Sequence, residues 1–211
     1  MDWQLDAAEV RVLGALMEKQ ITTPDVYPLS LNALVNACNQ RSNREPVVTY
    51  DDAVVEAALA SLRAKGLATR ITGADVRVPK NTERLIEKLN LGRREMALLC
   101  VLMLRGPQTP GELRGRSERL HAFDDLESVE NTLDRMAEAG LVKKLPRQPG
   151  SRESRFAHLL SGDVETTAWA AGEPAVEARP SGPTDKERLA ALEVELAELK
   201  RAFEEFRAKF E

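Results

Sequence analysis

The chain has 211 residues, 43% of them hydrophobic, with 34 acidic and 30 basic side chains and a formal net charge of −4. This length allows two small domains, and the mild negative charge argues against a uniformly basic nucleic-acid-binding protein. No apolar run is long enough to cross a bilayer, and the N-terminus lacks the pattern of a signal peptide. We therefore expect a cytoplasmic protein with no membrane partner.

The first part of the chain contains three helical patterns followed by a hairpin pattern. Helices are predicted at about residues 6–20, 31–38 and 51–65. The second and third have apolar residues at i, i+3, i+4 and i+7, and the first has a stripe of Val10, Leu13 and Met17 widened by Val12 and Leu16. Alternating residues at 67–71 and 76–79, with a glycine turn between them, predict a β-hairpin. Three helices followed by a β-hairpin is the arrangement of a winged helix-turn-helix domain.

The same pattern occurs a second time. Residues 9–24 align with residues 95–110 at an offset of 86, and residues 55–67 align with residues 129–141 at an offset of 74. The difference of 12 means that the first copy carries twelve extra residues before its third helix. A repeat that preserves both apolar positions and helix ends indicates two copies of one fold, so a second hairpin is expected within residues 141–160.

A polar segment, Asn39–Arg44, lies among the extra residues. Its amides and guanidiniums follow directly on an apolar helix, and Pro46 ends any helix before it. A core does not need such a segment, so we expect a functional role for it.

The stretch EVRVLGALMEKQITTPDVYPLSLNALVNACNQRSNREPV and the LRxxGL pattern at residues 62–67 resemble the YceH family of bacterial proteins. The resemblance covers residues 5–160. It implies a tandem winged-helix fold in the bacterial cytoplasm and implies little about activity.

These patterns predict an α+β protein, mainly α-helical with small β-hairpin wings, with tandem winged helix-turn-helix domains and a C-terminal coiled coil. The predicted parts are a first winged-helix domain (1–80), a connecting helix (81–91), a second winged-helix domain (92–160), a flexible linker (161–184) and a coiled-coil helix (185–211). The linker is rich in proline and glycine, and its one large apolar residue, Trp169, could dock on a groove.

The C-terminal segment has apolar residues at alternating spacings of three and four, which is typical of a coiled-coil seam. The seam residues are Leu189, Leu192, Leu196, Leu199, Phe203, Phe206 and Phe210. We expect a homo-oligomer formed through this helix. The alternative is a single helix that packs back on the body of the protein.

DNA binding is the first functional hypothesis. A third helix normally enters the major groove, but both third helices here are acidic, so contacts should come from the basic hairpins and the polar segment. The predicted nucleic-acid-binding residues are Gln40, Arg41, Asn43, Arg44, Arg70, Arg77, Lys143, Lys144, Arg147 and Arg152. The structural alternative is that charged hairpins are solvated turns and that the amides hold irregular backbone in place.

A protein-binding adaptor is the second hypothesis. An acidic third helix can recruit a basic partner protein, and the residues expected to do so are Asp125, Glu127 and Glu130. A coiled-coil tail suits both hypotheses because it tethers two copies.

Catalysis is not expected. His121 and His158 have no metal-ligand spacing, and no phosphate loop or nucleophile motif is present. Cys38 and Cys100 lie in apolar helical patterns and are expected to be buried free thiols in a reducing compartment. We predict a non-enzymatic protein with no cofactor and no metal.

Overall fold

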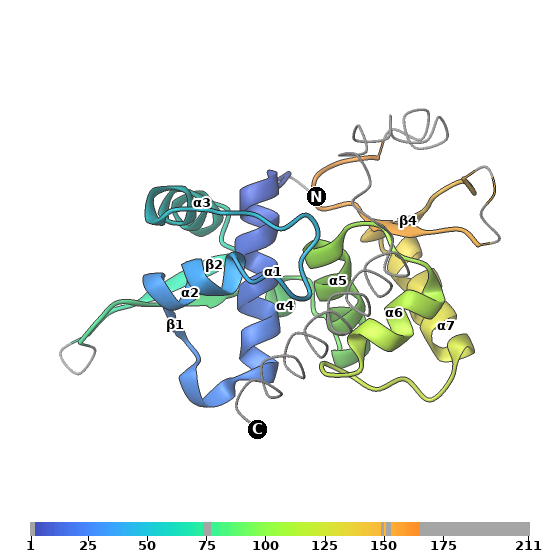
Figure 1. Ribbon diagram of the computed structural model, residues 1–211, viewed down its shortest axis with the longest axis horizontal. Coiled ribbons are helices and arrows are strands. Elements are labelled where there is room, and N and C mark those ends of the chain that lie inside the picture. The colour runs from blue at the N-terminus through green and yellow to red at the C-terminus, as the bar shows by residue number, and fades with distance from the viewer. Residues whose placement is uncertain (1–2, 74–76, 149, 151–152, 165–211) are drawn as a thin grey trace, which may run out of the picture. The chain divides into compact units, whose positions relative to one another are not determined.

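The described part of the chain follows the order helix, helix, helix, hairpin twice (Figure 1). It comprises residues 3–73, 77–148, 150 and 153–164 of a computed structural model. The predicted linker beyond residue 164, Trp169, Arg152 and all seven predicted seam residues lie outside the described residues.

The first repeat runs from α1 to β3. Its elements are α1 (Ala7–Thr22), the 3-10 helix η1 (Pro24–Val26), β1 (Leu29–Ser30), α2 (Leu31–Cys38), α3 (Asp52–Ala64), β2 (Ala68–Ile71) and β3 (Lys80–Glu83). Local side chains determine where these helices begin. Asp6 and Glu9 form a capping box at α1, and the Asp51 carboxylate accepts a hydrogen bond of 2.9 Å from the Val54 amide at the start of α3.

The second repeat runs from α5 to β5 and follows a short helix, α4 (Leu85–Lys88). Its elements are α5 (Arg93–Arg105), α6 (Pro110–Ser117), α7 (Leu126–Glu138), β4 (Val142–Lys144) and β5 (Phe156–His158). Both ends of α7 lie 74 residues beyond the corresponding ends of α3, as the alignment predicts. Strands β4 and β5 pair antiparallel and α7 contacts β4, so the hairpin expected within residues 141–160 is confirmed.

The twelve extra residues of the first repeat are divided between two places. Helices α1 and α5 begin 86 residues apart, α2 and α6 begin 79 apart, and α3 and α7 begin 74 apart. Seven extra residues therefore precede α2, and five lie between α2 and α3. The first group supplies β1, which pairs with β3 to complete a three-stranded sheet of order β1-β3-β2.

Two predictions for residues 76–91 were wrong. The second hairpin strand is β3 at residues 80–83, four residues later than predicted, and it pairs from Ala68↔Glu83 to Ile71↔Lys80. Pro79 cannot donate a ladder hydrogen bond, so the central strand begins after it. The connecting helix, predicted at 81–91, is therefore limited to α4, where the Glu83 carboxylate accepts from the Ile86 amide at 3.0 Å.

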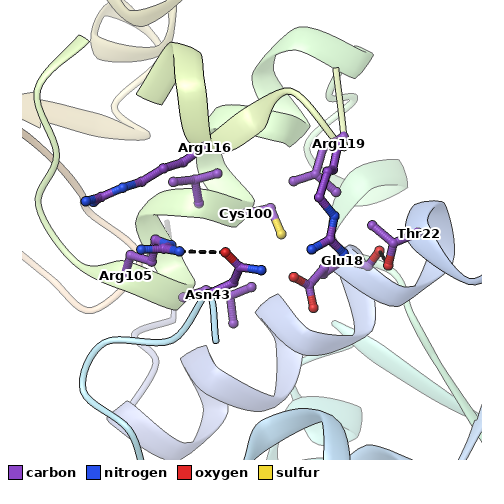
Figure 2. Close-up of a pocket in the computed structure, with 10 residues that line it drawn as sticks. Glu18, Thr22, Asn43, Cys100, Arg105, Arg116 and Arg119 are labelled. Atoms are coloured by element: carbon purple, nitrogen blue, oxygen red, sulfur yellow. Dashed lines mark hydrogen bonds between the residues drawn. The ribbon is translucent and has the colours of Figure 1, made fainter. Parts of the chain in front are cut away.

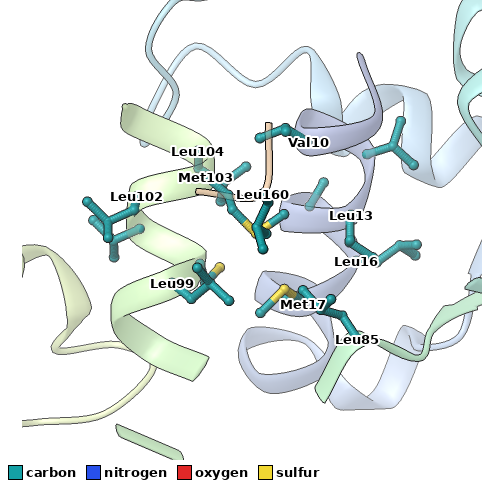
Figure 3. Packing of buried hydrophobic residues seen from close by; sticks show 14 of the residues in the cluster. Val10, Leu13, Leu16, Met17, Leu85, Leu99, Leu102, Met103, Leu104 and Leu160 are labelled. Atoms are coloured by element: carbon teal, nitrogen blue, oxygen red, sulfur yellow. The ribbon is translucent and has the colours of Figure 1, made fainter. Parts of the chain in front are cut away.

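A single hydrophobic core runs through both repeats, because α1 and α5 pack against each other (Figure 3). The buried residues Leu13 and Met17 of α1 correspond, at the offset of 86, to the buried residues Leu99 and Met103 of α5. The described residues belong to one compact unit.

Gly14 and Cys100 occupy equivalent positions at this contact and meet each other. The Cys100 Sγ donates to the Gly14 carbonyl oxygen at 3.5 Å. A Cβ atom at residue 14 would lie 3.0 Å from Leu104 Cδ2, so glycine is the residue that allows the two helices to approach this closely.

Candidate interaction surfaces

Arg44, predicted to contact nucleic acid, lies inside the protein. Its side chain is 0% exposed, and it donates to both carboxylate oxygens of Glu18, at 2.6 and 3.3 Å. It also donates to the Ala37 carbonyl oxygen at 2.9 and 3.1 Å. The prediction for Arg44 must therefore be corrected, because a buried ion pair with α1 occupies the guanidinium.

The charge of Glu18 depends on this pair. Burial alone would raise the pKa of Glu18, but hydrogen bonds and charge from Arg44, with smaller contributions from Lys19 and Arg119, hold it below its ordinary value. Glu18 is therefore ionised and already matched by a buried cation.

Asn43 joins the polar segment to the second repeat. Its backbone has a φ of 59°, and its side-chain oxygen accepts a hydrogen bond of 2.6 Å from the Arg105 guanidinium at the end of α5. The next amide, of Glu45, donates to the Leu104 carbonyl oxygen at 2.9 Å. The polar segment thus clamps the first repeat to α5.

Hydrogen bonds within the first repeat also hold the chain around the polar segment in place. The Asn39 side chain bonds to both the carbonyl and the amide of Tyr50, at 2.7 and 2.8 Å. The Arg11 guanidinium donates to the Cys38 and Pro46 carbonyl oxygens at 3.2 and 2.6 Å. The polar groups of Asn39 and Arg11 thus hydrogen-bond to backbone outside helices and strands and hold it in place, as the structural alternative to DNA binding expects.

Gln40 and Arg41 differ in what they offer a ligand. The Gln40 side-chain oxygen accepts from Arg44 at 3.2 Å, whereas Arg41 is exposed. Of the four predicted residues in this segment, Arg41 is the one whose side chain lies on the surface without a hydrogen bond to another described residue.

Two of the basic residues predicted for the hairpins, Arg70 and Lys143, are paired with carboxylates. Arg70 lies 3.0 Å from Glu56, and Lys143 lies 2.6 Å from Asp163. Lys144 sits over the Phe156 ring at 5.8 Å from its centroid. Lys144, Arg147 and Arg77 are exposed and remain available, but the hairpins carry less free charge than the sequence indicates.

The exposed face of α3 is apolar and small, and that of α7 is acidic. The exposed residues of α3 are Asp52, Ala53, Val54, Ala57, Ala60 and Ala64. Along α7, Glu127 and Glu130 are exposed as predicted for a protein-binding face, while Asp125 is the N-cap and accepts from the Ser128 amide at 2.7 Å. That hydrogen bond lowers the pKa of Asp125. Neither helix begins with a basic side chain that could reach a phosphate.

A groove of about 300 Å³ separates α7 from the β4–β5 hairpin. Its apolar surface includes Pro110, Leu126 and Phe156, and its α7 wall carries Glu130 and Asp134. Its hairpin wall carries Lys144, Arg147 and Glu153. Leu126, on the first turn of α7, is 41% exposed and forms part of the apolar surface of this groove. The groove could not be predicted from the sequence, because its two walls come from separate segments that meet only in the folded protein.

Burial disfavours the charged forms of both cysteines and of His158. Burial raises the pKa of the Cys38 thiol to about 12 and raises that of Cys100 still further. Burial also lowers the pKa of His158 to about 4. Within the described residues, no three His, Cys, Asp or Glu side chains are arranged to hold a metal ion, and no helix is long and apolar enough to span a membrane.

A family model described as "Protein of unknown function, DUF480" matches residues 5–151, which is more than half of the chain. The chain belongs to the DUF480 family. The DUF480 match confirms the family resemblance inferred from residues 5–160, that is, to an uncharacterised family of bacterial proteins.

Similar DUF480-type chains bear the name UPF0502 protein. The one from Solibacter usitatus is 67% identical over 211 residues, covering 100% of both chains. The one from Citrifermentans bemidjiense is 52% identical over 199 residues, covering 93% of this chain and 90% of the relative. The one from Geobacter sulfurreducens is 47% identical over 220 residues, covering 100% of both. None of these three names denotes an enzymatic activity.

Proposed function

We propose that this DUF480 protein is a non-enzymatic adaptor, built on two winged-helix domains, that binds a segment of a partner protein in the groove between α7 and the β4–β5 hairpin. The observation that carries the proposal is Leu126, an exposed apolar side chain beside the carboxylates of Glu127 and Glu130. An apolar anchor surrounded by charge is typical of a surface that captures a peptide.

The two walls of the groove indicate the chemistry of the partner. Glu130 and Asp134 face the groove from α7, and they would pair with a basic side chain. Leu126 and Phe156 would cover an apolar side chain next to it. We therefore expect a partner segment that carries an apolar residue beside a lysine or arginine.

The third helices support an adaptor more strongly than they support DNA readout. A helix in the major groove needs donors for base edges and cations near phosphates. The exposed face of α3 instead carries four alanines and a valine, at residues 53, 54, 57, 60 and 64, and α7 carries exposed carboxylates. The predicted C-terminal coiled coil would tether two such groove-bearing bodies and so increase the avidity for a partner with repeated motifs.

Photocrosslinking can identify the partner segment. A photoreactive amino acid replaces Leu126 in the full-length protein, and another replaces Arg93, an exposed residue on α5, as the control. Adducts specific to position 126 should map to a segment with the expected apolar and basic residues. The adaptor proposal fails if positions 126 and 93 give the same adducts.

Binding of a synthetic peptide with the mapped sequence then tests the groove itself. Replacing Glu130 and Asp134 by Gln should weaken binding about tenfold or more, because two charge pairs are lost. Glu138→Gln is the matched control, since Glu138 is exposed on the same helix and does not line the groove. Equal affinities for the wild type and the double variant would contradict the proposed site.

DNA association is the second candidate, and a specific observation favours it. Arg77 and Lys80 line an open surface hollow of about 740 Å³ together with Ser30 and Asn32 at the start of α2. Cations beside a helix N-terminus suit a backbone phosphate.

Fluorescence anisotropy with a mixed-sequence duplex at two salt concentrations separates the two candidates. The adaptor proposal expects no retention on DNA at moderate salt. The DNA hypothesis expects binding that falls steeply with salt. It also expects binding to be lost when the hairpin cations, either Arg77 and Lys80 or Lys143, Lys144, Arg147 and Arg152, are changed to Glu. On that hypothesis, replacing Asp125, Glu127 and Glu130 by Ala would leave binding intact or strengthen it. Such a result would place DNA association first.

A further inference from the structure

A small pocket lies where α1, the polar segment after α2, α5 and the end of α6 meet (Figure 2). Its volume is about 30 Å³, and Cys100 and Leu104 contribute apolar surface to it. A cavity needs roughly 10–15 Å³ of such volume to hold one water molecule. The pocket can therefore admit one small chemical group but not a whole nucleotide.

Three guanidiniums line this pocket, and they come from different places in the chain. Arg105 ends α5, Arg116 lies on α6, and Arg119 follows α6. Figure 2 shows Arg105 and Arg119 on opposite sides of Cys100, with Arg105 directed toward Asn43. The sequence signals two of them, Arg116 and Arg119, only through the density of arginine in residues 114–119.

The carboxylates near the pocket are already occupied. Glu18 is the one carboxylate among the pocket-lining residues, and Arg44 holds both of its oxygens from outside the pocket. Arg116 lies 3.5 Å from Glu112, but Arg155 holds the other oxygen of Glu112 at 2.8 Å. Around the pocket there are therefore more guanidinium groups than carboxylates to neutralise them.

Among the described residues, Arg105 and Arg119 form no short ion pair, although the charges of Glu45 and Glu18 act on Arg105 and that of Glu18 acts on Arg119. Within the part of the chain that the structure describes, neither forms an ion pair within 4.0 Å, and Arg105 donates instead to the neutral amide oxygen of Asn43. Burial lowers the pKa of Arg105, and the nearby positive charge of Arg116 lowers it further. Cations close to one another in a partly closed site repel each other. A bound anion relieves that repulsion and forms charge-assisted hydrogen bonds with them.

We propose that this pocket binds the phosphate group of a small phosphorylated molecule, held by Arg105, Arg116 and Arg119. A dianionic tetrahedral group matches three guanidiniums around one pocket better than a single carboxylate does, because it offers more acceptor oxygens and more charge. The pocket accommodates the phosphate alone, so the rest of the ligand lies outside it.

The position of the pocket gives the bound phosphate a structural effect. Arg105 already donates to Asn43 of the first repeat, while Arg116 and Arg119 belong to α6 and the segment that follows it. A phosphate held by all three adds a link at the place where the polar segment of the first repeat meets the second. Phosphate binding therefore slows hydrogen exchange in residues 39–47 as well as around α6.

Thermal unfolding of the full-length protein tests the site, with inorganic phosphate as the first probe and potassium chloride at matched ionic strength as the reference. Phosphate at ten times its Kd raises the Tm by about 3–5 °C relative to chloride. Isothermal titration with inorganic phosphate, O-phosphoserine and succinate separates free phosphate, a phosphate monoester and a dicarboxylate. The proposal requires that at least one phosphate compound binds more tightly than succinate.

A double variant, Arg116→Gln with Arg119→Gln, removes two of the ligands and leaves the Arg105–Asn43 bond intact. It should lose the phosphate-dependent shift and bind phosphate at least tenfold more weakly. Arg93→Gln with Arg94→Gln is the matched control, because it removes the same charge from exposed positions at the other end of α5, roughly 18 Å away. Should the double variant fold poorly by circular dichroism, Arg119→Ala alone provides the same comparison.

Besides equal or tighter binding of succinate, three results would overturn the proposal. The first is a wild-type shift that chloride reproduces at equal ionic strength, which would mean simple screening of the arginines. The second is an equal loss in the control variant, and the third is full phosphate binding by the double variant. None of these results depends on whether a peptide binds at α7.

Discussion

The Arg44 guanidinium and the Glu18 carboxylate form an ion pair inside the protein, with Nη2 2.6 Å from Oε2. The side chain of Arg44 is 0% exposed and that of Glu18 is 7% exposed, although the two residues are 26 positions apart. Because neither charge can return to water while the other stays buried, the polar segment and α1 depend on each other for stability.

Removing one partner of this pair should be costly. We expect Arg44→Gln to lower the free energy of unfolding by about 3–5 kcal/mol, because it leaves the Glu18 carboxylate buried without its cation. The double variant with Glu18→Gln should be more stable than Arg44→Gln alone, since it buries no unpaired charge. Urea unfolding measures all three proteins.

Arg41→Gln is the control for this prediction, because Arg41 lies on the same segment and is exposed. Its effect should stay within about 0.5 kcal/mol. If Arg41→Gln and Arg44→Gln destabilise the protein equally, the buried pair is not the main contribution of this segment.

Stability should decline on mild acidification because of His158. Its Nδ1 is buried without a hydrogen-bond partner in the described part of the chain, and burial lowers its pKa to about 4 from an ordinary value of 6.5. The unfolded chain therefore binds a proton that the folded protein excludes, and stability falls as the pH drops from 6.5 toward 4.

Between pH 7.5 and 5.5 the expected loss from His158 is about 1 kcal/mol. His158→Gln should flatten the dependence, whereas His121→Gln should preserve it. Urea midpoints at the two pH values provide the comparison, and an unchanged slope in His158→Gln would contradict the assignment.

The α1–α5 contact should tolerate no side chain at residue 14. A Cβ there meets Leu104 at 3.0 Å, so Gly14→Ala should destabilise the protein by about 1–3 kcal/mol through overpacking. Gly115→Ala on α6 is the matched control, because nothing lies within 4 Å of its Cβ position. That change should be neutral or stabilising by up to about 1 kcal/mol, owing to the higher helix propensity of alanine.

Thermal unfolding of the two glycine variants tests this difference directly. If Gly14→Ala unfolds at the wild-type temperature, the helices have room to separate without loss, and the close approach is not required.

The predicted C-terminal seam should control assembly. Replacing Leu192 and Leu199 by Asp places charges in an apolar seam, and light scattering should then report a smaller species. Circular dichroism should show that the rest of the protein keeps its helices. An unchanged mass would mean that copies of the chain associate elsewhere or not at all.

Periodicity allowed the helices to be predicted, because a packed helix shows its buried face in the sequence. The constant offset of 74 located α7 from α3 residue by residue. The strand β3 was misplaced because Pro79 ends an alternating run that looks like a strand, while the true strand, Lys80–Glu83, is polar in sequence. Its partner on the far side, β1, has two residues, too few to give a pattern.

The roles of the polar residues could not be predicted in the same way. The sequence contains nothing that distinguishes Arg44, which is buried, from Arg41, which is exposed three residues earlier. The distinction depends on Glu18, which belongs to another helix, and burial of a charge is decided by such distant partners. The pocket proposed to bind phosphate could not be predicted for the same reason, since Arg105 and Arg119 come to line one pocket only in the folded chain.

Gly14 and Cys100 touch although they are counterparts in the two repeats, and contact between counterparts is the signature of a twofold axis. Met17 of α1 and Leu99 of α5 are buried between the two helices (Figure 3). Two free copies of a single ancestral repeat would have joined through the same helix as a symmetric dimer. In one chain the two repeats need not stay identical, so the arginine pocket on one side of the contact needs no counterpart on the other.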